Sequence, residues 1–377
     1  MRLIAAIIFS AGLLALPTTP LRAQETTPPT PAPSPLDALR TKTGLTDEDR
    51  AAIRNWVSPR TAALVSDSPG NAFSELRGAA TGASADFRGA FATACIDQTR
   101  AAYKNASVRA ASQLITLVHS IPDAPLDAAT ALLFEALKDD RPSVRTAAAT
   151  GLRDLRQRIA TAGAAALSAD LGALRDAAKR ESADAVLKMI YHAMNFPDAI
   201  PNPPEPRANA QAILEVLDAR AALYESGKSR TESADAAGLR AIGMPGPSGS
   251  AALIAALDDA ERKRLSIAAG KMLRHAVRRY VSGPQPLIEV RAKTRNPQVA
   301  DQRDRVELLI EESERLLGEL LQLKPPPAAF ERIRRGRNAT EIVIEVNKWA
   351  DKLQETANVD VHVEAPSDDS GEKNSGG

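Results

Sequence analysis

Residues 137–152 read LKDDRPSVRTAAATGL, and this stretch decides the fold. Its acidic turn leads to Pro142, which suits the first turn of a helix because the N–H that proline lacks would have no partner there. Val144, Ala148 and Leu152 follow at the spacing of one helix face. The stretch therefore predicts the end of one helix, a short turn and a second helix.

The tripeptide Ser-Val-Arg occurs at 107–109 and again at 143–145, 36 residues apart, and each copy opens an alanine-rich run. Recurrence at this distance is typical of stacked helical repeats, in which no unit buries its apolar face alone. The sequence predicts an all-α fold: stacked antiparallel helix pairs, followed by further helices of less regular arrangement. The alternative is an irregular α-bundle in which the match is accidental.

The same stretch resembles the turn and second helix of a HEAT repeat, a unit of armadillo-type α-solenoids, most clearly over 127–157. In that family the turn aspartate and the arginine after the valine often link successive units in a polar ladder. Five positions here fill the family's places: Asp139 and Arg145 in the ladder, and Val144, Ala148 and Leu152 in the core. The resemblance implies an extended surface for protein-protein interaction.

Composition also favours helices. The 377 residues are 44% hydrophobic but only 3% aromatic, so alanine, leucine, isoleucine and valine must form the core. The formal net charge of +1 at pH 7 disfavours nucleic acid as a partner, and few aromatic side chains exist to stack on bases. The single cysteine, Cys95, has apolar neighbours and is expected to be a buried core residue.

The N-terminus has the layout of a secretory signal peptide. Arg2 provides a basic start, an apolar run covers 3–16, and the small residue Ala23 ends the segment, which predicts a cleaved leader at 1–23. The run is short for a membrane span, which needs about 20 apolar residues. We therefore expect no transmembrane helix in the mature chain and export to a periplasm, cell surface or medium, with an uncleaved anchor as the alternative.

Proline clusters and polar runs divide the remaining chain. The predicted segments are a Pro/Thr-rich disordered linker at 24–35, a HEAT-like repeat region at 36–196, a proline-rich connection at 197–207, a second helical region at 208–323, a C-terminal helix at 324–363 and a disordered tail at 364–377. Within them, Asp127 is expected to cap one helix, and a single last helix is expected over 329–355.

A basic stretch at 262–295 is the most pointed charged feature. Lys271, Arg274 and Arg278 recur at spacings of three and four, which places them on one helix face, with Arg279 beside them. This face is a candidate site for an anionic envelope polymer. The alternative is that these cations pair with the acidic helix expected at 302–323.

Motifs for catalysis and metal binding are missing from the sequence. The glycine-containing loop at 243–250 lacks the lysine of a phosphate-binding loop. The four histidines stand outside metal-ligand spacings: His119, His192, His275 and His362. We therefore expect no catalytic residue, metal or cofactor. The predicted function is an exported, non-enzymatic helical-repeat scaffold for an unknown protein partner; the alternatives are a polyanion-binding envelope protein and an enzyme with an unrecognised site.

Overall fold

The all-α fold expected from the sequence is confirmed. The computed structural model describes residues 36–66, 68–121, 123–195, 205–245, 252–282, 286–289 and 297–365. Among them there are helices and connections but no strand. The predicted leader, the linker at 24–35, most of the connection at 197–207 and most of the tail lie outside the described residues.

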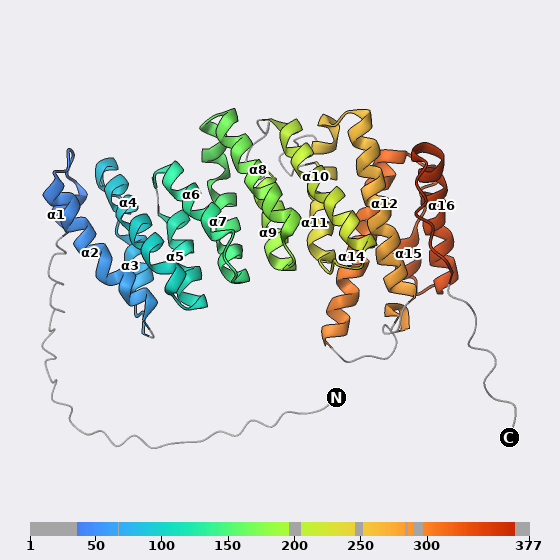
Figure 1. The fold of residues 1–377 in the computed structure, drawn as a ribbon, viewed down its shortest axis with the longest axis horizontal. Coiled ribbons are helices and arrows are strands. Elements are labelled where there is room, and N and C mark those ends of the chain that lie inside the picture. The colour runs from blue at the N-terminus through green and yellow to red at the C-terminus, as the bar shows by residue number, and fades with distance from the viewer. Residues whose placement is uncertain are drawn as a thin grey trace, which may run out of the picture.

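The helices lie side by side in two rows, and the stack runs from α1 at its blue end to α16 at its red end (Figure 1). One row contains α2 (Asp47–Val65), α4 (Ala85–Ala102), α6 (Leu126–Ala136), α8 (Ala164–Arg180), α10 (Pro206–Glu225), α12 (Asp259–Val281) and α16 (Ala339–Ala357). The other contains α5 (Val108–Ser120), α7 (Pro142–Thr161), α9 (Asp184–Met194), α11 (Glu232–Gly243) and α14 (Pro297–Leu321). The described residues also form short elements: α1 (Asp37–Arg40), α3 (Ala72–Gly78), α15 (Ala329–Arg334) and the 3-10 turns Tyr103–Asn105 and Leu253–Ala256.

Consecutive helices form packed pairs with one member in each row. These pairs are α4 with α5, α6 with α7, α8 with α9, α10 with α11, and α12 with α14. Within the second row α5 packs on α7, α7 on α9, α9 on α11 and α11 on α14. Since α9 contacts α11 and α8 contacts α10, both rows continue past the proline-rich connection.

Local sequence signals explain where several helices begin. Thr46 begins α2 with a capping box, in which its hydroxyl accepts the Asp49 N–H and the Asp49 carboxylate accepts the Thr46 N–H at 2.8 Å. Helix α7 begins at Pro142, as expected. The prediction that Asp127 caps a helix is wrong. Pro125 precedes the first residue of α6, so Asp127 lies inside the first turn, where its charge favours the helix dipole.

The single last helix expected over 329–355 is also wrong, because the chain breaks between α15 and α16. Gly336 adopts a left-handed conformation with φ of +67°, which glycine reaches without steric cost. Asn338 then caps α16 by accepting the Glu341 N–H at 2.9 Å. The glycine therefore ends one helix and the asparagine starts the next.

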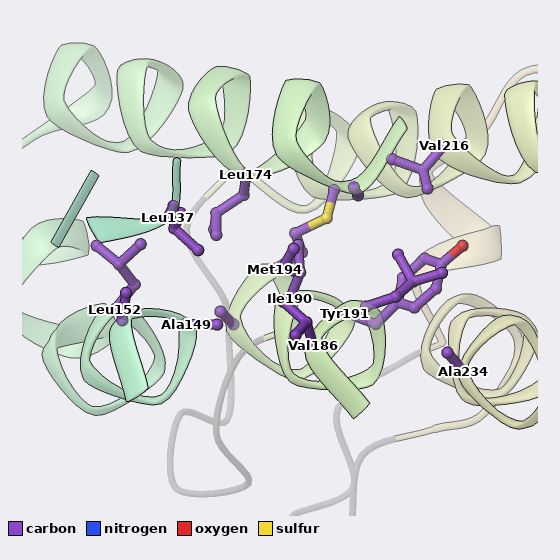
Figure 2. Packing of buried hydrophobic residues seen from close by; sticks show 14 of the residues in the cluster. Leu137, Ala149, Leu152, Leu174, Val186, Ile190, Tyr191, Met194, Val216 and Ala234 are labelled. Atoms are coloured by element: carbon purple, nitrogen blue, oxygen red, sulfur yellow. The ribbon is translucent and has the colours of Figure 1, made fainter. Parts of the chain in front are cut away.

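Small aliphatic side chains dominate the core, as the composition predicts. Figure 2 shows Ile190 and Tyr191 of α9 between buried side chains of α7 and Ala234 of α11. Alanines at these contacts let the helix axes approach closely, and leucines and isoleucines fill the remaining space. Cys95 is buried as expected, and burial raises the pKa of its thiol, which keeps the thiol protonated.

Candidate functional site

One long side of the stack is formed by the connections between the two helices of each pair, and we call it the turn edge. It comprises the connections 103–107, 137–141, 181–183 and 226–231, the helix turns beside them, and the last turn of α12 at 278–282. Side-chain hydrogen bonds tie each of these connections to a neighbouring one. The edge is therefore continuous along the stack.

Arg145 joins the second connection to the third. Its guanidinium donates two parallel hydrogen bonds to the Glu181 carboxylate, at 2.7 and 2.8 Å. The third nitrogen of the guanidinium, Nη1, donates to the backbone carbonyl oxygens of Asp139 and Asp140 at 2.8 and 3.0 Å. Glu181 in turn accepts the Ala183 N–H at the start of α9. A bidentate pair of this kind fixes the orientation of both units.

Arg141 joins the second connection to the first. It donates to the carbonyl oxygens of Ala106 at 2.7 Å and Tyr103 at 3.1 Å. The Asp139 carboxylate holds the same guanidinium through hydrogen bonds, which lower the pKa of that carboxyl. Asp139 therefore stays within its own turn, and the side chain that reaches the next unit is Arg145.

Arg220 joins the fourth connection to the third from inside the stack. It donates to the Glu181 carbonyl oxygen at 2.9 Å and to the Ser229 hydroxyl at 2.7 Å. Sequence reasoning missed this residue, although one signal was available. Arg220 follows Val216 by four residues and Leu217 by three, which places a charge within the apolar face of α10.

Beside Arg220, a fully buried carboxylate is held by hydroxyl groups from three elements. Asp235 accepts hydrogen bonds from Tyr191 at 3.0 Å, Tyr224 at 2.7 Å and Thr231 at 2.8 Å. Burial raises the pKa of Asp235, and Arg220 and the hydroxyl donors oppose that rise. The cluster connects α9, α10 and α11 across the proline-rich connection, and it was not predicted.

The five repeat positions named from the sequence lie together in and around α7. Val144, Ala148 and Leu152 are fully buried, while Asp139 and Arg145 lie on the turn edge. The upstream Ser-Val-Arg copy is different, because Val108 is 51% exposed. Val108 is the first residue of α5, whereas Val144 is the third residue of α7, so the two tripeptides occupy different positions in their helices.

The basic face of α12 is divided between paired and unpaired cations. Three Lys and Arg side chains of α12 form ion pairs with carboxylates of α10 and of the start of α11: Arg264–Asp218, Lys271–Glu225 at 3.0 Å and Arg279–Glu232. Arg278 is exposed and makes no ion pair to a described residue, and Arg274 is half-buried. The paired carboxylates come from α10 and α11 and not from the acidic helix expected at 302–323. Arg291, Lys293 and Arg295 lie outside the described residues.

A hollow of about 450 Å³ opens on the turn edge between the first two connections. Side chains of both charges line it: Tyr103, Lys104, Glu135, Lys138, Asp139, Asp140 and Arg141. Lys104 pairs with Glu135 at 2.5 Å, and Arg141 is held by Asp139. Lys138 and Asp140 are left exposed at this hollow.

Comparison with known proteins adds no family assignment: no family model and no curated protein matches the sequence. In the described part of the chain, no group of three or more His, Cys, Asp or Glu side chains is arranged to hold a metal ion. None of the described helices combines the length and apolar character needed to cross a membrane.

Replacing Glu181 by glutamine is expected to lower the free energy of unfolding by about 2 kcal/mol at pH 7, because Arg145 loses a charged acceptor. Burial opposes the charge of Glu181, but hydrogen bonds from Arg145 and the Ala183 N–H outweigh it and lower the pKa of the carboxyl. A carboxyl with a lowered pKa stabilises the fold above its unfolded-state pKa of about 4.3 and loses that effect as the pH falls through its folded-state value.

Urea unfolding of both chains between pH 7 and pH 3 measures this effect. The difference between the wild type and Glu181→Gln should shrink below about pH 4.3, the unfolded-state pKa of a glutamate. Asp140→Asn is the matched control, because the exposed Asp140 carboxylate makes no hydrogen bond or ion pair to a described residue. A pH-independent difference for Glu181→Gln would mean that its charge does not link the units.

Proposed function

We propose that this chain is a HEAT-like α-solenoid that acts as a non-enzymatic scaffold and presents an extended surface to a protein partner. The observation that carries the proposal is the recurrence of unit-to-unit bonds at nearly constant sequence distance. Arg141 bonds to Ala106 across 35 residues, Arg145 to Glu181 across 36, and Arg220 to Glu181 across 39. Repeats of this kind form elongated surfaces suited to protein binding.

The polyanion alternative has less support. Lys271 and Arg279 are each paired with a carboxylate, so only part of the charge on this face is available to a polymer. Charges paired in this way leave little net field to attract an anionic chain. We therefore favour the binding of a protein partner over the binding of a polyanion.

We further propose that the scaffold acts outside the cytoplasm, since the sequence begins with the layout of a secretory leader. N-terminal sequencing of the exported protein is expected to begin at Gln24. An exported chain that still begins at Met1 would instead indicate that the apolar run at 3–16 is kept as a membrane anchor.

Affinity capture from envelope extracts of the source organism tests the scaffold function, with the mature chain from Gln24 as bait. One or more proteins should co-elute at a fixed stoichiometry and dissociate reversibly on dilution. Val144→Asp, whose buried charge is expected to unfold the stack, is the control for adhesion to exposed apolar surface. Recovery of the same proteins with both baits, or of none with the folded bait, would contradict the proposal.

A further inference from the structure

Some cations on the turn edge are exposed and make no hydrogen bond or ion pair through their side chains to a described residue. They are Arg109, Lys138, Arg180, Lys228, Arg230 and Arg278. They come from successive units, from the start of α5 to the end of α12. The pattern therefore belongs to the whole edge and not to one helix.

The carboxylates of the same edge are mostly engaged within the protein. Asp139 binds Arg141, Glu181 binds Arg145, Glu225 binds Lys271 and Glu232 binds Arg279. Asp184 accepts the Ala234 N–H at 2.9 Å. Asp140 is the exposed carboxylate that remains beside the hollow at 103–141. Because most carboxylates of the turn edge are already bound within the protein, the cations that face solvent give the edge a positive surface.

The spacing of these cations fits an extended peptide. Neighbouring helices in such a stack lie about 8–10 Å apart. A peptide in the extended polyproline II conformation advances about 3.1 Å per residue with three residues per turn, so every third side chain points the same way. Acidic side chains at every third position of a peptide would therefore meet one unit each. A uniformly charged polymer fits less well, because Asp140 interrupts the row of cations and would repel it.

We infer that the turn edge binds an acidic, extended segment of the partner protein, with carboxylates recurring about every three residues. This inference rests on the proposed scaffold function and names the surface and the chemistry of its partner. Arg109 and Arg180 contact the segment directly, while Arg141 and Arg145 hold the connections in place beneath it. The attraction acts between exposed charges, so binding weakens as salt is added.

A labelled peptide of four Glu-Ser-Gly repeats is the probe, and its Gln-Ser-Gly counterpart is the uncharged control. Fluorescence anisotropy measures the Kd of each peptide for the full mature chain at low and high salt. We expect the acidic peptide to bind at least about tenfold more tightly than the neutral one at low salt, and this preference to fall as salt screens the charges.

Two triple variants with the same change in net charge locate the site. The edge variant carries Arg109→Glu, Arg180→Glu and Arg230→Glu. The control variant carries Arg50→Glu, Arg54→Glu and Arg77→Glu on α2 and α3, where these arginines are likewise exposed and without ion pairs to described residues. Because all six side chains are exposed, both variants should melt close to the wild type, which circular dichroism checks.

Loss of peptide binding by about tenfold in the edge variant, with a change of less than about threefold in the control, would support the inference. Equal losses in both variants, or no preference of the wild type for the acidic peptide, would overturn it. A heparin fragment that binds the edge more tightly than the peptide would assign it to a polyanion and also overturn it. Capture of the natural partner by the edge variant would overturn this inference alone, since the scaffold function would stand.

Discussion

Val144→Asp is expected to unfold the stack of helices. Val144 is 0% exposed in the third position of α7, a helix that packs against both α5 and α9. An aspartate there would place an unpaired charge in the apolar core, at a cost of at least about 3 kcal/mol. Because each pair of helices is covered by its neighbours, loss of α7 exposes the apolar faces on both sides. Thermal unfolding followed by circular dichroism measures the effect.

Val108→Asp is a matched control for this prediction. Val108 stands in the same Ser-Val-Arg tripeptide, 36 residues earlier, but is 51% exposed at the first position of α5. An aspartate in the first turn of a helix is neutral or slightly favourable, so the change in stability should stay within about 0.5 kcal/mol. Equal melting temperatures for the two variants would show that burial at Val144 does not support the stack.

This contrast also marks how far the sequence predicts the structure. Helical spacing after Pro142 correctly predicts which face of α7 is buried, because periodicity depends only on local geometry. The match of Ser-Val-Arg does not predict register. Pro142 starts α7 two residues before Val144, whereas Ser107 caps α5 directly before Val108. The same tripeptide therefore occupies different positions in two helices when those helices begin at different residues relative to it.

The candidate site was predictable only in part, for a related reason. Arg145 stood out because its place after the turn resembles a family pattern. Its partner Glu181 and the buried residue Arg220 belong to other units, and the sequence does not state which units touch. Apart from Arg278, the exposed cations of the turn edge could not be identified either, because a cation is available to a partner only if no neighbouring unit supplies a carboxylate. Such pairings are properties of the stacked rows.

Gly238→Val is expected to lower the free energy of unfolding by about 3 kcal/mol. A Cβ at this position of α11 would lie 2.5 Å from Cζ and 2.6 Å from Cε1 of the Tyr191 ring, which is far inside van der Waals contact. The ring cannot retreat freely, because its hydroxyl donates to the buried Asp235 at 3.0 Å. The substitution therefore either separates α9 from α11 or leaves a buried carboxylate short of a donor.

Gly89→Val separates this contact from the general effect of replacing a helical glycine. A Cβ at Gly89 in α4 meets nothing within 4 Å, so valine there should change stability by no more than about 0.5 kcal/mol, with helix propensity slightly in its favour. Urea unfolding of both variants measures the difference. If Gly238→Val were as stable as Gly89→Val, the Tyr191 ring would have room to move, and its hydrogen bond to Asp235 would not hold it in place.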